Sequence, residues 1–251
     1  MFGKSLNGGH GKSNNGNHAG HLIELRGVVK NFENASNTFA ALRGIDLNID
    51  VGEFTAVIGK SGSGKSTLLN IIAGIDRPTS GQVFVAGKHI DCMTEDELAR
   101  WRGENLGIVF QFFQMLPSLT LLDNVVLPME LAACRKHGPK RRRTRAMELL
   151  ERVGLADQAT MLPSLVSGGQ LQRAAIARAL ANDPPLIVAD EPTGNLDSQS
   201  AFNVFRLFQQ LVAEGKTLLM VTHDLELARA VPRKIEIRDG QFLTAELAAG
   251  V

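Results

Sequence analysis

A glycine-rich segment at residues 59–67 has the composition and spacing that bind phosphate groups. It reads Gly-Lys-Ser-Gly-Ser-Gly-Lys-Ser-Thr, fits the pattern GxxxxGK[ST] and follows the apolar run 54–58. Glycines allow backbone angles that aim successive N–H groups at phosphate oxygens, and the helix expected from Ser66 to Ala73 adds its positive dipole end. Lys65 can reach the β- and γ-phosphates, and Ser66 offers a hydroxyl to Mg²⁺. We therefore expect ATP or GTP to bind here, in preference to a glycine-rich turn without a ligand. The expected nucleotide contacts in this loop are Gly59, Lys60, Ser61, Gly62, Ser63, Gly64, Lys65, Ser66 and Thr67.

Two adjacent carboxylates follow a second apolar run. Leu-Ile-Val-Ala at 186–189 is followed by Asp190 and Glu191, and ligands gather at the carboxyl ends of parallel strands. Asp190 has the oxygen ligands that Mg²⁺ prefers, and Glu191 would then orient or deprotonate a water that attacks the γ-phosphate. A solvated pair is the common alternative for an isolated Asp-Glu, but the phosphate loop in the same chain favours the catalytic interpretation.

The apolar runs that must position these residues predict a parallel α/β core. Residues 54–58, 186–189 and 218–221 are mostly continuous apolar runs, which is typical of buried parallel strands. Segments whose apolar residues have helical spacing lie between these runs. Strands that alternate with helices indicate a parallel sheet. The predicted helix faces are Ala201, Val204, Phe205, Phe208, Leu211 and Val212, and Ala146, Leu149, Leu150 and Val153. The stretch from Leu22 to about Asp50 is turn-rich and strand-like, so we expect an antiparallel layer there.

The chain is expected to hold one domain. Residues 1–21 are rich in Gly, Asn, Ser and His and predict a disordered leader. Their histidines His10, His18 and His21 could hold a metal weakly, although a flexible tail is the simpler interpretation. Residues 22–251 would form the single domain. No strand pattern appears after Val109-Phe110, so a helical subdomain is expected over about 93–180. No internal repeat is present, which excludes two tandem copies of the domain.

Composition excludes several classes of protein. The chain is 44% hydrophobic and 21% charged, with 27 Lys+Arg against 26 Asp+Glu, so its net charge does not predict binding to nucleic acid or a membrane surface. No apolar run approaches the ~20 residues that span a bilayer, and no signal peptide is recognisable. Cys92 and Cys134 lie far apart without metal-ligand spacing, which favours free thiols in a reducing compartment.

A motif at residues 166–180 connects the chain with a known family. Val-Ser-Gly-Gly-Gln, followed by Leu-Gln-Arg-Ala-Ala-Ile-Ala-Arg-Ala-Leu, resembles the signature motif and helix of ABC transporter ATPases, with Val166 where the family usually has Leu. The other family motifs follow in the family's order from Leu22 to about Leu243. The resemblance implies a P-loop NTPase of the ABC-ATPase fold, with a RecA-like parallel-sheet core, an antiparallel β layer and a helical insert subdomain.

The resemblance also implies roles for individual residues. Gln111 is similar to the Q-loop glutamine, which touches Mg²⁺ together with Ser66 and Asp190. Glu191 and His223 are similar to the Walker B glutamate and the switch histidine, so Glu191, His223 and Gln111 are the implied catalytic residues. The chain has no tyrosine, which makes Phe32 the first candidate for adenine stacking and Phe39 the second. The implied D-loop is Asn195, Leu196 and Asp197, and the implied signature is Ser167, Gly168, Gly169 and Gln170.

Partners follow from the same resemblance. The signature of one copy would cover the ATP of a second copy in a head-to-tail dimer, with Mg²⁺ as the second cofactor. The wording Ala-Asp-Glu-Pro-Thr-Gly-Asn-Leu-Asp, with Phe-Gln-Phe-Phe-Gln-Met-Leu-Pro, is similar to ATPases of lipoprotein-release, macrolide-export, antimicrobial-peptide and cell-division systems, although Phe113 and Leu171 depart from the commonest pattern. These imply a separate integral-membrane permease with an extracytoplasmic domain, at the cytoplasmic side of the inner (plasma) membrane. The work would be export, lipid or lipoprotein extraction, or mechanotransmission.

Two other classes of function fit the sequence less well. ATPases of the superfamily that act on DNA or ribosomes carry long heptad insertions or two cassettes, whereas the interval from Gln111 to Ser167 is short and lacks sustained heptads; no nucleic-acid partner is expected. A P-loop GTPase or kinase would leave the signature and Thr222-His223-Asp224 unexplained.

Three further features have competing interpretations. The basic stretch 135–145 could bind anionic lipid or nucleic acid, but a solvated loop that opens a helix is favoured. The apolar stretch 117–128 predicts a permease-docking surface and core packing equally well. Trp101 is expected to be a packing residue.

Overall fold

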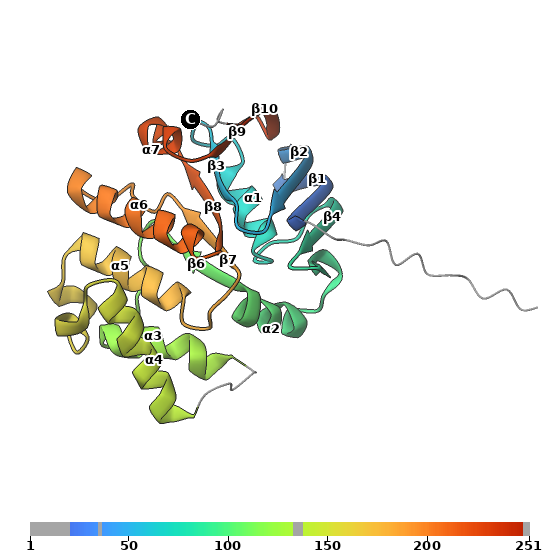
Figure 1. The fold of residues 1–251 in the computed structure, drawn as a ribbon. Helices are drawn as coiled ribbons and strands as arrows, with labels where there is room; N and C mark the ends of the chain where they lie inside the picture. Colours follow the sequence, from blue (N-terminus) through green and yellow to red (C-terminus); the bar gives the residue numbers. More distant parts are fainter. Residues whose placement is uncertain (1–20, 35–36, 133–137, 248–251) are drawn as a thin grey trace, which may run out of the picture.

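The centre of the structure is a six-stranded sheet whose inner strands run parallel. The computed structural model describes residues 21–34, 37–132 and 138–247, and this sheet has the order β10-β9-β3-β8-β7-β6 (Figure 1). All neighbouring strands pair in parallel except β9 and β10. Since β3, β6, β7 and β8 end at one edge, the segments that follow them meet there. The strands are β3 (Phe54–Ile58), β6 (Leu106–Val109), β7 (Leu186–Asp190), β8 (Thr217–Thr222), β9 (Arg233–Arg238) and β10 (Gln241–Leu247).

A second, antiparallel sheet confirms the layer expected from the first part of the chain. Its order is β2-β1-β4-β5, with β1 (His21–Asn34), β2 (Asn37–Asp50), β4 (Ser80–Val85) and β5 (Lys88–His89). β1 already includes His21, one residue inside the boundary expected for the leader; the rest of that segment, residues 1–20, lies outside the described residues.

Helix α1 (Lys65–Ile72) lies between the two sheets, where Figure 1 draws it, and contacts β2 and β4 on one side and β7 and β8 on the other. It therefore needs apolar residues around most of its circumference. Leu68, Leu69, Ile71 and Ile72 are at most 1% exposed and belong to one hydrophobic cluster with residues of both sheets. The helix thus fixes the phosphate loop, which leads into it, between the two sheets.

The opposite face of the large sheet is covered by α5 (Gly168–Ala179) and α6 (Ser198–Ala213). Both begin at capping side chains: Ser167 caps α5, and Asp197 accepts a hydrogen bond from Ser200 N at the start of α6. The face predicted for α6 is confirmed at its centre, where Val204, Phe205, Phe208 and Leu211 are buried. Ala201 and Val212, at its two ends, are half-buried. These helix starts are the two segments that the sequence connects with the signature and the D-loop.

Among the described residues between 93 and 180, β6 is the only strand and the other regular elements are helices. α3 (Leu121–Leu131) and α4 (Pro139–Arg152) pack against each other and against α5, at the lower left of Figure 1. The predicted face of α4 is buried, with Ala146, Leu149 and Leu150 at most 1% exposed. The remaining elements are α2 (Glu95–Asn105), α7 (Leu225–Arg229) and the short 3₁₀ turns η1 (Ile90–Cys92), η2 (Ala156–Gln158) and η3 (Pro163–Leu165).

Core packing explains most of the apolar stretch 117–128. Leu121, Leu122, Val125 and Val126 are buried in the cluster beneath α3. Trp101 is 5% exposed and packs in the other cluster, as expected of a packing residue.

The described part of the basic stretch, residues 138–145, opens α4, and Arg143 pairs there with Asp123 at 2.9 Å; residues 133–137, with Cys134, lie outside the described residues. Within the described residues, no helix is both long and apolar enough to cross a membrane.

Asn124 ties the loop that follows β6 to α3, and this buried amide predicts a stability effect. Its Oδ1 accepts from Leu116 N at 2.8 Å, and its Nδ2 donates to the carbonyls of Leu116 and Leu119 at 3.1 Å and Thr120 at 3.0 Å. Asn124→Ala should lower the free energy of unfolding by about 2–4 kcal/mol, because several buried backbone groups lose their partner. Urea denaturation measures this change. The control Asn203→Ala, on the exposed side of α6, should change it by less than about 0.5 kcal/mol. A similarly small loss for Asn124→Ala would show that the amide does not hold the loop.

Candidate active site

The strand ends and the β1–β2 hairpin enclose a cleft of about 590 Å³, a volume in the range of small-molecule sites. Residues from five places in the sequence meet in it: the hairpin, the phosphate loop, the end of β7, the segment after β6 and the segment after β8. Its lining consists of Phe32, Phe39, Ala41, Ser61, Gly62, Gly64, Lys65, Ser66, Thr67, Gln111, Asp190, Glu191 and His223. Most residues expected at the site from sequence are therefore brought together, while Gly59, Lys60 and Ser63 are not part of this lining.

The phosphate loop is closely packed, and two of its glycines have no room for a side chain. A Cβ on Gly59 would lie 2.3 Å from Ile237 O, and one on Gly64 would lie 2.6 Å from Ala41 O, where φ is also +105°. Gly64 is the N-cap of α1 and has no side chain to satisfy the first N–H groups of the helix, so those groups are available to an anion. Lys65, only 7% exposed, donates to the carbonyls of Gly59 at 2.8 Å and Lys60 at 2.9 Å. The ammonium group is thereby held inside the loop.

Ser66 and Asp190 bring two oxygen ligands together. Ser66 Oγ donates to Asp190 Oδ1 at 3.3 Å, and the Gln111 side chain lines the same cleft. Two ligands in neighbouring octahedral positions around Mg²⁺ lie about 3.0 Å apart, so this all-oxygen set fits that ion. Burial, with a smaller contribution from the Glu191 carboxylate, raises the pKa of Asp190, against the Ser66 hydrogen bond and the Lys65 charge. A bound cation would offset this penalty on the carboxylate.

Glu191 is held in one orientation by β8 and the residue after it. Its Oε2 accepts from Thr222 Oγ1 at 3.1 Å and from His223 N at 3.2 Å, and its Oε1 lies 2.9 Å from His223 Nδ1. Its φ of +44° lies in the left-handed region, which is strained for a residue with a side chain. Such strain at a cleft is typical of a side chain that must point in one direction. His223 is 66% exposed and Glu191 13%, so the histidine covers the carboxylate from the solvent side.

The segment after β6 is tied to both the D-loop segment and α5. Asn195 Nδ2 donates to Gln111 O at 3.2 Å, and a Cβ on Gly194 would lie 3.2 Å from Gln111 Nε2. Arg178 donates to Gln114 O at 2.5 Å and to Phe113 O at 2.8 Å, where both residues have positive φ. The half-buried guanidinium thus stabilises a strained turn beside Gln111.

The signature segment lies apart from the cleft. Among the described residues, the cleft lining includes none of residues 167–170. Ser167 and Gln170 form a capping box, with Ser167 Oγ accepting from Gln170 N and Gln170 Oε1 accepting from Ser167 N. A Cβ on Gly169 would lie 2.5 Å from Ser200 Oγ, so this glycine lets α5 start against the start of α6. The second anion site expected from sequence therefore lies outside the nucleotide cleft of its own chain.

The two aromatic candidates lie side by side at the tip of the hairpin. Phe32 in β1 is the direct cross-strand partner of Phe39 in β2, and they are 42% and 57% exposed. Both line the cleft, and Lys30 Nζ lies 4.9 Å from the centre of the Phe32 ring. Both rings are therefore accessible for a base to stack on, and Phe32 and Phe39 both remain candidates for adenine stacking.

A phosphate loop at a helix start, a carboxylate pair at a neighbouring strand end and a cleft of this volume define a P-loop nucleotide-binding protein. Similarity to known proteins identifies the family within this class. The family model described as ABC transporter matches residues 42–194. The uncharacterized ABC transporter ATP-binding protein YknY of Bacillus subtilis (strain 168) is 46% identical over 224 residues, which are 89% of this chain and 96% of YknY.

The chain is also similar to a full-length exporter and to a solved ATP-binding cassette. The macrolide export ATP-binding/permease protein MacB of Rhodopseudomonas palustris (strain HaA2) is 45% identical over 229 residues, 91% of this chain and 35% of MacB. A dimeric structure of the ATP-binding cassette MJ0796 in a post-hydrolysis state, bound to ADP and Pi, is 41% identical with a TM-score of 0.85, covering 92% of this chain and all of that one.

The chain belongs to the ABC transporter family. It is an ATP-binding and ATP-hydrolysing domain of that family, and its fold is the ABC ATPase fold expected from the signature. It spans nearly the whole of YknY but about a third of MacB, so what the full-length export protein does beyond its ATPase part is a separate question.

Two side chains that support the site were present in the motifs but received no role from sequence. Thr222 donates to Glu191, and Arg178 holds the turn at residues 113–114. The sequence could have indicated this role for Thr222, because its hydroxyl lies at the end of one strand, next to the acidic end of the neighbouring strand. No local signal exists for Arg178, whose partners lie 64 and 65 residues away in sequence.

The raised pKa of Asp190 predicts a pH-dependent effect on stability. Because the folded pKa lies above the unfolded value, this carboxylate lowers stability, and the loss develops as pH rises through the range between the two values. Asp190→Asn should therefore raise the Tm of the nucleotide-free, magnesium-free protein at pH 7, and the gain should shrink toward about pH 4. Differential scanning fluorimetry across this range measures both. The control Asp157→Asn, at an exposed position, should show no such trend; a lower Tm for Asp190→Asn at pH 7 would contradict the burial effect.

Proposed function

We propose that this chain is the ATP-hydrolysing motor subunit of an ABC transporter, working as a head-to-tail dimer that drives a separate integral-membrane permease. The proposal rests on one observation: a single chain holds the two parts of the site in separate places. The phosphate loop, the carboxylates and His223 meet in one cleft, while Ser167 starts α5 outside it. A second copy related by a two-fold axis supplies the missing face to each cleft.

In this dimer, each ATP lies between the phosphate loop of one copy and the signature of the other. The N–H groups at the start of α1 and the Lys65 ammonium hold the β- and γ-phosphates, with Phe32 or Phe39 against the adenine. Ser167, Gly168 and Gly169 of the second copy cover the γ-phosphate with the start of α5. The dimeric arrangement of the related cassette MJ0796 supports this assembly.

Hydrolysis uses the residues at the strand ends. Glu191 accepts a proton from a water that attacks the γ-phosphorus, the bond to the β,γ-bridging oxygen breaks, and ADP and phosphate form. His223 contacts the γ-phosphate and, through its bond to Glu191, keeps the carboxylate in place. Ser66, Asp190 and Gln111 would hold Mg²⁺, which neutralises phosphate charge when bound.

The membrane partner is proposed from the relatives. MacB is named as an export ATP-binding/permease protein, and YknY is named as an ABC transporter ATP-binding protein. We propose a permease with an extracytoplasmic domain, a cassette bound to it on the cytoplasmic side of the inner (plasma) membrane, and a task in export, lipid or lipoprotein extraction, or mechanotransmission. One ATPase domain over residues 22–251, with a helical subdomain over about 93–180, suits this role.

The first test is the oligomeric state of Glu191→Gln. This variant should bind Mg-ATP, hydrolyse it at least about 100-fold more slowly and change from monomer to dimer when ATP is added, because the bound triphosphate joins the two copies. Light scattering after size exclusion measures the mass. The double variant Lys65→Ala/Glu191→Gln is the control and should stay monomeric. Turnover at the native rate would remove Glu191 from catalysis, and an ATP-bound monomer would contradict the homodimer.

A second test asks whether the signature acts on the other copy. Lys65→Ala damages the phosphate loop and Gly168→Asp places a negative charge at the signature, so each variant alone should be inactive. In an equal mixture, half of the dimers combine both variants and contain one undamaged site, so activity should return to about a quarter of the native level if the two sites act independently. ATPase assays of the mixture and of the separate variants measure this. A mixture no more active than its parts would contradict a shared site.

A further inference from the structure

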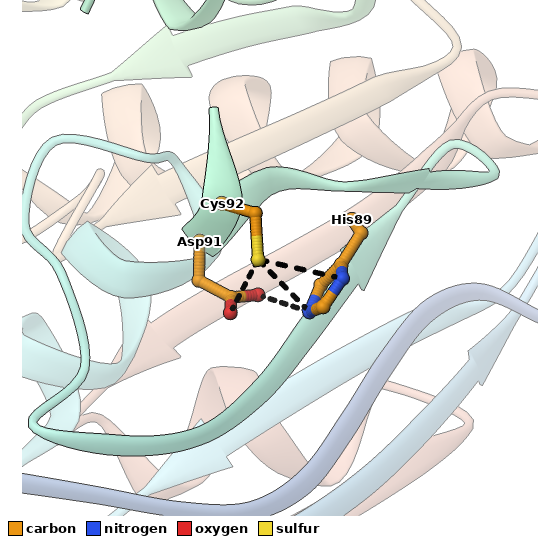
Figure 2. Close-up of side chains that lie close together, drawn as sticks. All are labelled: His89, Asp91 and Cys92. Atoms are coloured by element: carbon orange, nitrogen blue, oxygen red, sulfur yellow. Dashed lines mark hydrogen bonds and ion pairs between the residues drawn. The ribbon is translucent and has the colours of Figure 1, made fainter. Parts of the chain in front are cut away.

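Three side chains with metal-binding atoms gather where β5 meets the turn η1, in the antiparallel layer and apart from the ATP cleft. Figure 2 shows His89, Asp91 and Cys92 converging from this one segment. His89 Nε2 lies 3.0 Å from Asp91 Oδ1. Cys92 Sγ lies 3.6 Å from His89 Nδ1, 3.8 Å from His89 Nε2 and 3.7 Å from Asp91 Oδ2. One nitrogen, one oxygen and one sulfur are thus mutually close.

These separations are those of ligands around one small ion. Zinc bonds to thiolate sulfur at about 2.3 Å and to imidazole nitrogen or carboxylate oxygen at about 2.0–2.2 Å, so tetrahedral angles put the ligand atoms about 3.4–3.6 Å apart. His89 Nε2 lies 3.0 Å from Asp91 Oδ1 and 3.8 Å from Cys92 Sγ, and the second carboxylate oxygen, Oδ2, lies 3.7 Å from the sulfur. One ligand atom from each residue already lies within 4.8 Å of the other two, so small side-chain rotations bring all three to the spacing that one ion requires.

Contacts with the surrounding sheet already orient two of the three ligands. Asp91 Oδ1 accepts from Val83 N at 2.8 Å, which leaves Oδ2 for another partner. The His89 ring stacks on Phe84 with centroids 4.4 Å apart and an interplanar angle of 16°. Supporting contacts of this kind fix ligand orientation at protein metal sites. The Asp91 side chain is 13% exposed and that of His89 33%, so the site is partly shielded but open on one side.

The backbone that carries the ligands is anchored as well. Arg77 donates to the carbonyls of Asp91 at 2.9 Å and Met93 at 2.6 Å, and Ile90, between the ligands, is 1% exposed in the core. The turn therefore holds His89, Asp91 and Cys92 in place without any contribution from the ion.

We propose that His89, Asp91 and Cys92 bind one zinc-class divalent transition-metal ion, with a fourth position left to water. Thiolate, imidazole and carboxylate together select a borderline-soft ion, whereas Mg²⁺ prefers the all-oxygen set of the ATP cleft. Partial desolvation, with the Asp91 charge, raises the pKa of the Cys92 thiol in the metal-free chain. Binding therefore forms a sulfur–metal bond and releases the thiol proton to solvent. The bound ion would fasten η1 to β5 and stabilise the folded chain.

Cobalt provides the test, because thiolate-bound Co²⁺ absorbs in the near ultraviolet through charge transfer from sulfur. The full chain with Cys134→Ser, in which Cys92 is the only cysteine, is titrated with Co²⁺ without nucleotide. The band should grow to saturation at one equivalent and disappear when zinc displaces cobalt. Adding Cys92→Ser should abolish the band, and adding His89→Gln instead should weaken binding by at least about tenfold.

The controls separate this site from the leader and from misfolding. His10→Ala/His18→Ala, also with Cys134→Ser, should keep the band, since leader histidines supply no sulfur. Zinc should raise the Tm of Cys134→Ser but not of Cys134→Ser/Cys92→Ser, and circular dichroism confirms that both are folded. A band that survives Cys92→Ser, a missing band in Cys134→Ser, or binding that depends only on the leader histidines would overturn the proposal.

Discussion

The parallel pairing of β3 with β8 and of β8 with β7 is the constraint on which the site depends. The register places Ile58 opposite Thr222 and Val221 opposite Asp190. Each strand is almost fully buried, so a slip of the register would expose apolar side chains and leave backbone groups without partners. This ladder alone determines that the phosphate loop, the carboxylate pair and His223 begin from adjacent points.

Several groups of the site are in states that would each destabilise the folded chain if considered alone. Asp190 is a partly desolvated carboxylate, Glu191 has a left-handed φ, and the turn at residues 113–114 is strained. Left-handed φ angles at residues with side chains cost about 1–3 kcal/mol each. The two hydrophobic clusters on either side of the sheet make this strain tolerable. The result is a set of charged groups held in fixed places around one cleft, which limits the reorganisation required when ATP binds.

The sequence predicted the elements whose pattern is local and strong. β3, β7 and β8 are continuous apolar runs, and the phosphate loop and signature have fixed spacing. β4, β9 and β10 were not predicted, because they mix polar and apolar residues, as in Arg-Lys-Ile-Glu-Ile-Arg of β9, and their pairing depends on distant strands. Nor could the sequence predict the hydrogen bonds of Arg178 to residues 113 and 114 or the contact of Gly169 with Ser200. Nothing in a local pattern specifies which remote part of the chain a residue will meet.

The contacts around Gln111 connect the proposed dimer face with the catalytic strand end. Gly168 at the start of α5 lies near Phe113 and Leu196, Arg178 further along α5 holds the 113–114 turn, and Asn195 binds Gln111 O. A second copy that presses on the signature or the D-loop therefore acts on the backbone that positions Gln111 in the cleft. Because these elements share direct hydrogen bonds and packed glycines, a shift in one must be accommodated by the others. In a motor of this design, closure of the dimer and completion of the magnesium and water environment would be one event, which makes hydrolysis depend on the partner.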